Sequence, residues 1–210
     1  MSTHASFSAA RDEFERAWND PAHTRIEPAA VDVNALLREH FRGGEEITLS
    51  RSMLWEAELE KAWNPGAYIP GVVREGESWG REALGSAEES FVRASQQRAW
   101  KEGVDGGLVL EEVYTSTNEQ SVLFLGRAEL TRADGTRLEA GRHQPLFHVE
   151  HAVSGTDSQP QNRWRIVHLT PELDEALTVR QRREKGTPEW VRGFVAAHVR
   201  KALGVELIPR

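Results

Sequence analysis

The chain has 210 residues, and 33 acidic against 26 basic side chains give it a formal net charge of −7. That length favours one domain with appended segments, or at most two small domains, and the acidic excess argues against nucleic acid as the main partner. No apolar run reaches the roughly 18–20 residues that span a bilayer, and no secretory signal is visible at the N-terminus. The lack of cysteine excludes disulfides and thiolate chemistry. We therefore expect a globular, cytoplasmic protein with no membrane partner.

The first part of the chain is typical of amphipathic helices. Apolar residues at helical spacing predict helices over residues 6–18, 33–42 and 52–63. Asp32 is the expected N-cap of the second helix, and Asn64-Pro65-Gly66 is expected to end the third.

Two short extended segments and a further helix follow. The extended segments are predicted over residues 68–74 and 77–81. Ser86 and Glu89 have the spacing of a capping box, in which each side chain bonds the other's backbone amide. This spacing predicts a helix over residues 86–102.

The centre of the chain favours strands. Alternating apolar and polar residues predict strands over residues 107–115, 121–132, 137–153 and 163–169. Asp134-Gly135 supplies the positive φ angles of a hairpin turn. Successive hairpins predict an antiparallel meander.

The tail carries two similar helix starts. Thr170 and Thr187 are each followed by Pro and Glu, which places an N-cap, an N1 proline and an acid in the first turn. The second helix is expected to bury Trp190 and Phe194 and to end at Gly204.

Three local stretches add to this order of elements. They are Trp79-Gly80-Arg81-Glu82-Ala83-Leu84, the hairpin over residues 127–142, and the paired stretches 146–150 and 164–168. Over about residues 48–170, the chain resembles the NTF2-like superfamily, and within it the SnoaL-like, or ketosteroid-isomerase-like, group. The resemblance implies an α+β fold in which a curved antiparallel sheet wraps on helices as a cone with an apolar interior.

The resemblance also implies a division of the chain. Residues 1–47 would be an N-terminal helical extension, residues 48–170 the NTF2-like domain, and residues 171–210 a C-terminal helical pair. The added helices carry large apolar side chains that need partners, so we expect them to cover the cone or to form the interface of a homodimer.

The group includes isomerases, dehydratases, cyclases and epoxide hydrolases, as well as non-catalytic binding or assembly subunits, so the fold does not choose the reaction. Our leading hypothesis is cofactor-independent acid–base chemistry, of isomerase, dehydratase, cyclase or lyase type, on a hydrophobic oxygenated substrate in the cone. One alternative is a non-catalytic ligand-binding or assembly protein. Another is a metal-dependent lyase or oxygenase that uses residues between His143 and His151.

The densest polar cluster lies on the predicted strand 137–153. On a strand, His143, Phe147, Val149 and His151 share one face. The apolar pair favours the cone interior for this face, which makes His143 a candidate acid or base that titrates near neutral pH. The alternative is a rim histidine paired with a carboxylate.

Two further titratable residues are candidates. Glu112 and Tyr114 share a strand face with Leu108 and Leu110. If this face is the inner one, Glu112 is a buried carboxylate suited to proton shuttling, and otherwise it is solvated. His168 has large apolar neighbours and is either a catalytic partner or a core histidine. The predicted catalytic residues are His143, His168 and Glu112.

Aromatic side chains and one arginine are the predicted substrate contacts. They are Trp55, Trp63, Tyr68, Trp79, Tyr114, Arg127 and Phe147. The first four are expected around the cone mouth, where they either stack on a flat ligand or form a helix–sheet core. An inward Arg127 would hold an anionic group, whereas an outward one would form a surface pair with Glu129.

The histidine-rich stretch also raises a metal site. His143, His148, Glu150 and His168 are its possible ligands, but strand alternation splits the members between two faces. The sequence has no serine-hydrolase elbow, dinucleotide fingerprint or Walker A motif. We therefore expect no metal and no cofactor.

Overall fold

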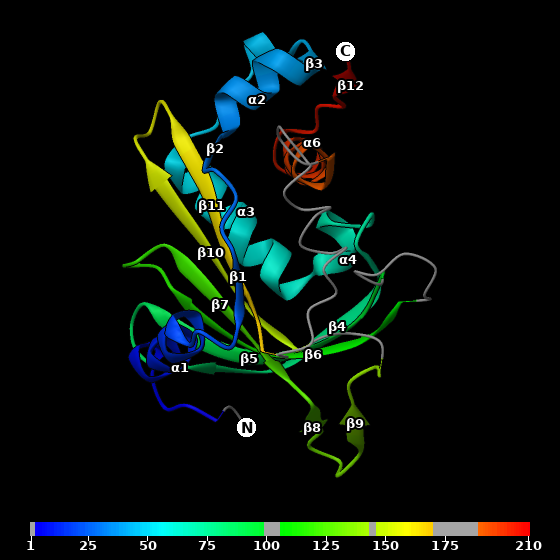
Figure 1. Cartoon of the computed structure of the whole chain (residues 1–210). Helices are drawn as coiled ribbons and strands as arrows, with labels where there is room; N and C mark the ends of the chain where they lie inside the picture. The colour runs from blue at the N-terminus through cyan, green and yellow to red at the C-terminus, as the bar shows by residue number, and fades with distance from the viewer. Residues whose placement is uncertain (1–2, 99–105, 143–145, 170–188) are drawn as a thin grey trace.

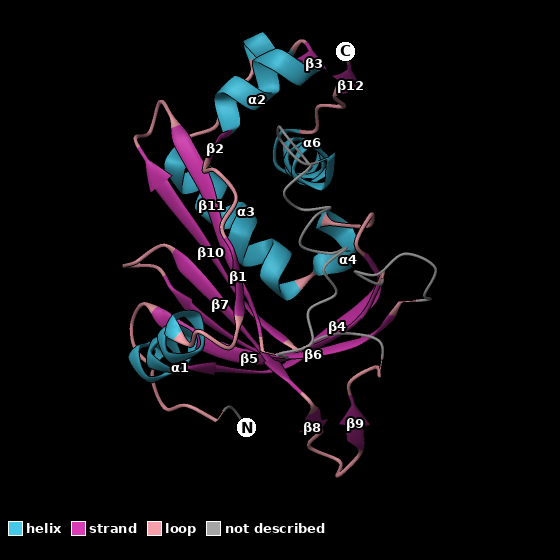
Figure 2. Ribbon diagram, viewed as in Figure 1, coloured by secondary structure: helices cyan, strands magenta, loops and turns pink. Residues whose placement is uncertain are grey.

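The structure, a computed structural model, describes residues 3–98, 106–142, 146–169 and 189–210. It confirms the mixed α+β class, with a large, open and curved antiparallel sheet that carries helices on both faces (Figures 1 and 2). The strands of this sheet are β1 (Thr24–Ile26), β2 (Val31–Asp32), β4 (Val73–Ala83), β5 (Glu88–Gln97), β6 (Gly107–Ser116), β7 (Ser121–Arg127), β10 (Phe147–Gly155) and β11 (Pro160–His168).

The strand order is β1-β11-β10-β7-β6-β5-β4, and β2 also pairs with β11. All pairs are antiparallel, as the hairpin signals predict. Between β7 and β10 the chain forms a separate hairpin arm of β8 (Glu129–Thr131) and β9 (Arg137–Glu139), whose turn contains Gly135 at φ 87°. A small second pair joins β3 (Phe41–Arg42) to β12 (Ile208–Pro209).

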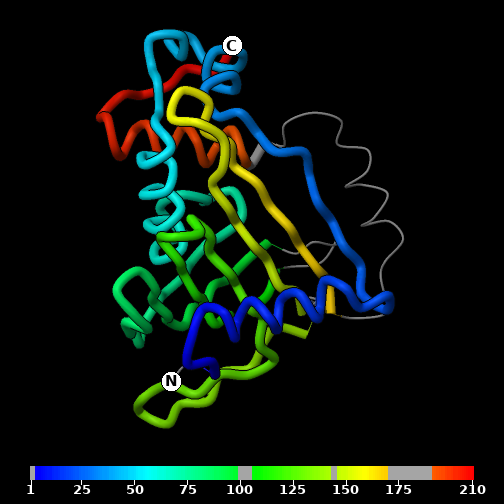
Figure 3. Tube along the Cα trace, turned by 90° about the vertical axis from the view of Figure 1, so that its left-hand side faces the viewer, coloured from blue at the N-terminus to red at the C-terminus, as the bar shows by residue number. Residues whose placement is uncertain are grey.

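The helices divide between the two faces of the sheet. They are α1 (Phe7–Asn19), α2 (Val33–His40), the 3₁₀ turn η1 (Gly44–Glu46), α3 (Arg51–Trp63), α4 (Pro65–Tyr68) and α6 (Glu189–Leu203). We call the concave face that carries α2, α3, α4 and α6 the inner face, and the face that carries α1 the outer face (Figure 1). Figure 3 shows α1 lying across the strands, with α6 close to α2 at the other end of the molecule.

The predicted helices at 6–18, 33–42 and 52–63 are confirmed as α1, α2 and α3. The Asp32 side chain caps α2 by accepting the amide of Ala35 at 2.9 Å. The predicted C-terminal helix corresponds to α6, which buries Phe194 and ends before Gly204 at φ 67°. The helix expected from Thr170 and the side chain of Trp190 lie outside the described residues.

The helix predicted over residues 86–102 is wrong, because residues 88–97 form the strand β5 between β4 and β6. Glu89 pairs with Arg81 at 2.6 Å instead of closing a capping box. Backbone pairing on both edges, with Phe91 turned inward, outweighs the local helix signal. Of the two extended segments predicted before it, residues 77–81 lie in β4, whereas the first segment begins at the end of α4 and only its residues 73–74 lie in β4.

The order of elements therefore differs from the one that the NTF2-like resemblance implies. Residues 88–97, where the resemblance implies a helix, form β5 and pair with β4 and β6. The N-terminal segment adds β1 and β2 beside β11. None of the helices within the described ranges combines the length and apolar character needed to cross a membrane.

Candidate functional site

Strand alternation gives the sheet two buried faces of different composition. The inner core packs Phe124, Phe147, Val149 and Trp164 against the four helices, whereas the outer core packs strand residues against α1. The predicted inward direction of Phe147 and Val149 is confirmed. His151 follows on the same face and is the histidine of this stretch that the structure places inward.

A charged cluster is buried between α3 and the inner face. Glu58 is completely buried and Lys61 is 2% exposed. The Lys61 Nζ lies 2.6 and 2.5 Å from the two Glu58 oxygens, and Asn162 Nδ2 donates to Oε1 at 2.6 Å. His151 Nδ1 lies 3.1 Å from Oε2. We call Glu58, Lys61, His151 and Asn162 the inner cluster.

The protonation states in the inner cluster follow from burial and charge. Burial raises the pKa of Glu58, but the Lys61 charge and the His151 contact outweigh it and hold the pKa at about 2. Burial and the Lys61 charge lower the pKa of His151 to about 4, against the opposing effect of Glu58. At neutral pH, Glu58 is therefore ionised and His151 neutral.

The hydrogen bond to Glu58 assigns the tautomer of His151. Because a carboxylate only accepts, Nδ1 carries the proton, and Nε2 presents its lone pair. Phe124 and Trp164 hold the ring edge-on, with centroid distances of 5.0 and 6.1 Å. The side chain of His151 is 15% exposed, while that of Glu58 is not exposed at all. A neutral imidazole oriented by a carboxylate is the arrangement of a general base.

A second buried ion pair lies next to the inner cluster. Arg93 on β5 donates to Glu111 on β6 through Nε at 2.7 Å, and its Nη2 lies 2.6 Å from the same oxygen. Its Nη1 donates to the Ala62 carbonyl of α3 at 3.2 Å, and its guanidinium lies 4.4 Å from the Phe124 ring centroid. The pair fixes α3 to the sheet and places a second cation near His151.

The structure does not bring the three predicted catalytic residues together. His143 lies outside the described residues. His168 is buried on the inner face, where burial lowers its pKa to about 4, and its ring lies 6.0 Å from that of Phe147. Glu112 is on the outer face, because the face it shares with Tyr114 turns toward α1. It accepts from Arg127 at 2.8 Å and from Thr3 at 2.5 Å.

Four of the seven predicted substrate contacts are in the inner core or pack against it. They are Trp55, Trp63, Tyr68 and Phe147. Trp63 packs edge-on against Phe91 at 5.0 Å. The Tyr68 hydroxyl donates to Glu60, and burial together with this bond raises the pKa of Tyr68 to about 12.

The other three predicted contacts lie elsewhere. Tyr114 is in the outer core and accepts the His4 amide at 3.1 Å. Arg127 lies on the outer face and binds Glu13 at 2.5 and 3.1 Å, so its predicted pairing with Glu129 is wrong. Trp79 lies 5.0 Å below the guanidinium of Arg132 from the β8 arm. These side chains do not share the inner face with His151.

The possible metal ligands are separated in the same way. His148 and Glu150 are on the outer face, whereas His151 and His168 are on the inner one. His148 accepts the Gly126 amide at 3.1 Å, and Glu150 binds Arg165 at 2.5 Å. Within the described ranges, no three His, Asp or Glu side chains are grouped for a metal ion.

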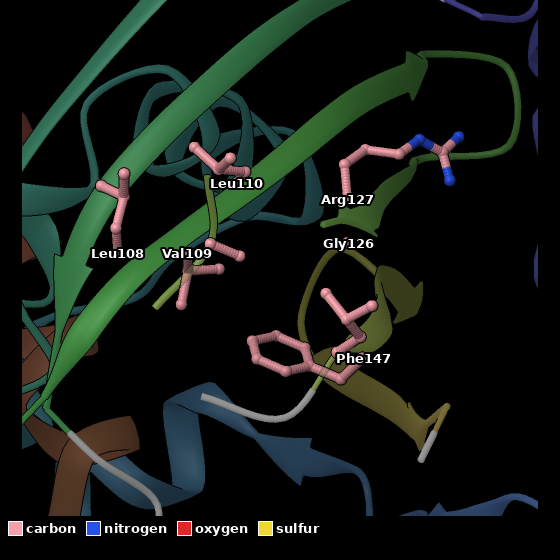
Figure 4. Close-up of a pocket in the computed structure, with 8 residues that line it drawn as sticks. Leu108, Val109, Leu110, Gly126, Arg127 and Phe147 are labelled. Carbon is pink, nitrogen blue, oxygen red and sulfur yellow. The ribbon is translucent and has the colours of Figure 1, made fainter. Parts of the chain in front are cut away.

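A small apolar crevice lies where β7 leaves the sheet (Figure 4). Its lining comprises Leu108, Val109, Leu110, Gly126, Arg127, Ala140, Leu146 and Phe147. Gly126 is required there, because a Cβ would lie 2.3 Å from the Phe147 carbonyl oxygen. Figure 4 shows the Arg127 guanidinium pointing away from the pocket, so the pocket offers apolar contacts rather than an anion site.

Comparison with known proteins gives fold-level likenesses only. No protein-family model and no curated protein matches the chain. Among solved structures, a Zhui aromatase/cyclase from Streptomyces sp. R1128 aligns at 11% identity over 87% of each chain, with a TM-score of 0.44. Ara h 8.0201 aligns at 9% identity over 87% of this chain and 99% of its own, with a TM-score of 0.47. A truncated norcoclaurine synthase from Thalictrum flavum aligns at 11% identity over 88% and 93%, with a TM-score of 0.43.

Sequence reasoning missed Glu58, Lys61 and Asn162. The apolar stripe predicted for the third helix is Trp55, Leu59, Ala62 and Trp63. Trp55 and Ala62 are buried as predicted, but the buried face of α3 also includes Leu54, Glu58 and Lys61, while Leu59 and Trp63 are only partly buried. The signal was present, because Glu58 and Lys61 lie four and seven residues after Leu54. A glutamate and a lysine on one apolar stripe indicate a buried pair.

Proposed function

We propose that the chain binds a small, hydrophobic, oxygenated molecule on its inner face and performs acid–base chemistry on it without a cofactor. His151 is the base that takes the proton, and Glu58 orients it and stabilises the imidazolium that forms. The observation that carries the proposal is the neutral, partly exposed His151, whose Nδ1 bonds a fully buried carboxylate at 3.1 Å.

The residues around His151 support placing the ligand on the inner face rather than on the outer face. Phe124 and Trp164 frame His151 and would hold an apolar ligand. The order of elements, in which a meander curves around a C-terminal helix, supports a helix-grip arrangement rather than an NTF2-like one.

The proposal is tested with 5-nitrobenzisoxazole, an apolar probe whose ring opens when a base removes one proton. We expect the protein to accelerate the opening, and we expect His151→Asn to lower the rate about 100-fold or more. Asparagine places an amide nitrogen near the position of Nδ1, so it keeps the donor to Glu58 and removes Nε2. The matched control is His148→Asn, which changes a histidine of the same strand on the outer face and should keep the rate.

The pH profile identifies the base. The rate should rise with pH through about 4, where His151 loses its proton, and level off above it. A midpoint near 6.5, or equal rates in the two variants, would contradict the assignment.

The second candidate function is ligand binding without catalysis. Three donors, from Lys61, His151 and Asn162, already bind Glu58. This favours binding without catalysis, because a buried ion pair that is fully hydrogen-bonded can have a structural role alone. In that case 2-naphthol, a flat apolar probe with one hydroxyl group, would bind and quench the tryptophan fluorescence. The protein would then leave 5-nitrobenzisoxazole unchanged.

A further inference from the structure

Lysine is rare in this chain. The sequence contains 22 arginines but only four lysines. Lys61 is one of the four, and it is 2% exposed on the inner side of α3, whereas the side chain of Lys201 is 47% exposed. A lysine differs from an arginine in keeping an amine that can lose its proton when it is buried.

The Lys61 amine is in direct contact with a proton acceptor and an apolar wall. Its Nζ lies 2.5 and 2.6 Å from the two Glu58 oxygens, and 4.0 Å from the centroid of the Phe194 ring on α6. The ion pair engages two of the three ammonium hydrogens. The amine therefore sits between a buried carboxylate and the aromatic cover of the inner face.

The electrostatic environment lowers the pKa of the Lys61 amine. Burial lowers the pKa of Lys61, and the charge of Arg93 acts in the same direction, while Glu58 opposes both. Lys201 provides a contrast, because its hydrogen bond to Glu60 raises its pKa. The buried lysine is thus more readily a nucleophile than the exposed one.

We propose that Lys61 forms an imine with the carbonyl group of an aldehyde or ketone bound on the inner face. The proposal rests on the proposed function in requiring that a ligand reaches this face, and it names the substrate class as a carbonyl compound.

Imine formation needs only groups that are in contact, and its atoms and charges balance. Glu58 takes one proton from the Lys61 ammonium, and the neutral amine attacks the carbonyl carbon. A proton then moves from nitrogen to the new oxygen, which gives a neutral carbinolamine. Glu58 returns its proton to the hydroxyl, which leaves as water, and the C=N⁺ ion remains paired with the carboxylate. Nitrogen loses two hydrogens, water gains two, and the charge is unchanged.

The imine would also make a substrate proton acidic enough for His151 to remove. A C=N⁺ group acidifies the hydrogens on the adjacent carbon, and His151 Nδ1 contacts the same Glu58 oxygen that Lys61 contacts. The base of the proposed function and the imine would then act on neighbouring atoms of one substrate.

The test is reductive trapping on the whole chain. The protein is incubated at pH 7 with benzaldehyde and sodium cyanoborohydride, and benzylated lysines are mapped by mass spectrometry. We expect Lys61 to be labelled faster than Lys201, because the pKa of Lys61 is lowered and that of Lys201 is raised, so Lys61 has the larger share of free amine at pH 7. Lys61→Arg keeps the charge and removes the nucleophile, so its inner-face label should disappear.

Labelling of Lys201 while Lys61 stays unmodified would overturn the imine. Binding of 2-naphthol separates this failure from that of the proposed function. If 2-naphthol binds and Lys61 is not labelled, the imine is wrong and the inner-face ligand stands. If 2-naphthol also fails to bind, both proposals are wrong.

Discussion

The two faces of the sheet both carry buried or half-buried charge, but they use it differently. On the outer face, Arg127 and Arg165 bind glutamates of the sheet and of α1, and these partners include Glu13 and Glu15. On the inner face, Arg93 binds Glu111, while a lysine, a histidine and an asparagine surround Glu58. Arginine cannot lose its proton in a protein, so the outer network is suited to holding α1 in place. The inner cluster instead groups three side chains that can exchange protons, which are Glu58, Lys61 and His151.

Burial sharpens this difference. Glu58 is completely buried, whereas the side chain of Glu13, its counterpart on the outer face, is 23% exposed. Removing one member of a buried pair leaves a charge without compensation, while water can reach a partly exposed pair. The two faces should therefore respond unequally to matched substitutions.

The largest effect is expected from Glu58→Gln. It leaves the Lys61 ammonium buried without its counter-ion, and we expect the free energy of unfolding to fall by about 3–5 kcal/mol, measured by urea denaturation. The double variant Glu58→Gln with Lys61→Met removes both charges and should recover much of the loss. A loss below about 1 kcal/mol in the single variant would show that the pair is solvated.

The second prediction concerns the pH dependence of stability. The pKa of His151 is lowered from 6.5 to about 4 in the folded chain, so the unfolded chain binds an extra proton between these values. Stability should fall as the pH drops from about 6.5 to about 4, by about 3 kcal/mol from this residue, and level off below.

His151→Asn removes this contribution, so thermal or urea unfolding at a series of pH values should give a flatter curve. His168→Asn should flatten the curve to a similar extent, since burial lowers the pKa of His168 to about 4 as well. An unchanged slope in His151→Asn would mean that His151 has an ordinary pKa.

The third prediction tests the outer face with Glu13→Gln. Burial raises the pKa of Glu13, but hydrogen bonds from His148, Arg127 and His4 outweigh it and hold the pKa far below 4.5. The stability that it contributes is therefore complete above pH 4.5 and is lost as the pH falls below it.

At pH 7 the substitution should lower the free energy of unfolding by about 1–2 kcal/mol. The rate with 5-nitrobenzisoxazole should not change. A collapse of that rate would show that the outer network positions the inner site, and the contrast between the faces would fail.

The smallest effect is expected from a helix cap. Ser6 Oγ accepts the Ala9 amide of α1 at 3.1 Å, and Ser50 Oγ accepts the Met53 amide of α3 at 3.2 Å. Each serine-to-alanine change should cost about 1 kcal/mol. Hydrogen exchange should rise in α1 alone for Ser6→Ala and in α3 alone for Ser50→Ala, whereas joint loosening would mean that the two faces unfold together.

Local signals predicted much of the fold. The helices α1, α2 and α3 and the caps at Asp32 and Gly204 follow from neighbours within one or two turns. The strand β5 could not be predicted from local signals, because its stability comes from pairing with β4 and β6. Its own sequence favours a helix instead, since Ser86 and Glu89 have the spacing of a capping box.

The site was predicted only in part. The alternation of residues along a strand placed Phe147, Val149 and His151 on one face correctly. It could not determine whether Glu112 lies on the inner or the outer face, because that depends on where α1 packs. Glu58 and Asn162 are 104 residues apart, and only the folded sheet shows that they share a hydrogen bond.

The most direct test of the inner-face account is long-range proton–nitrogen NMR of the histidine rings across a pH series. We predict that His151 is protonated on Nδ1 at neutral pH and gains its second proton only near pH 4. A His151 that carries its proton on Nε2, or that titrates near 6.5, would contradict the claim that Glu58 orients a neutral base on the inner face.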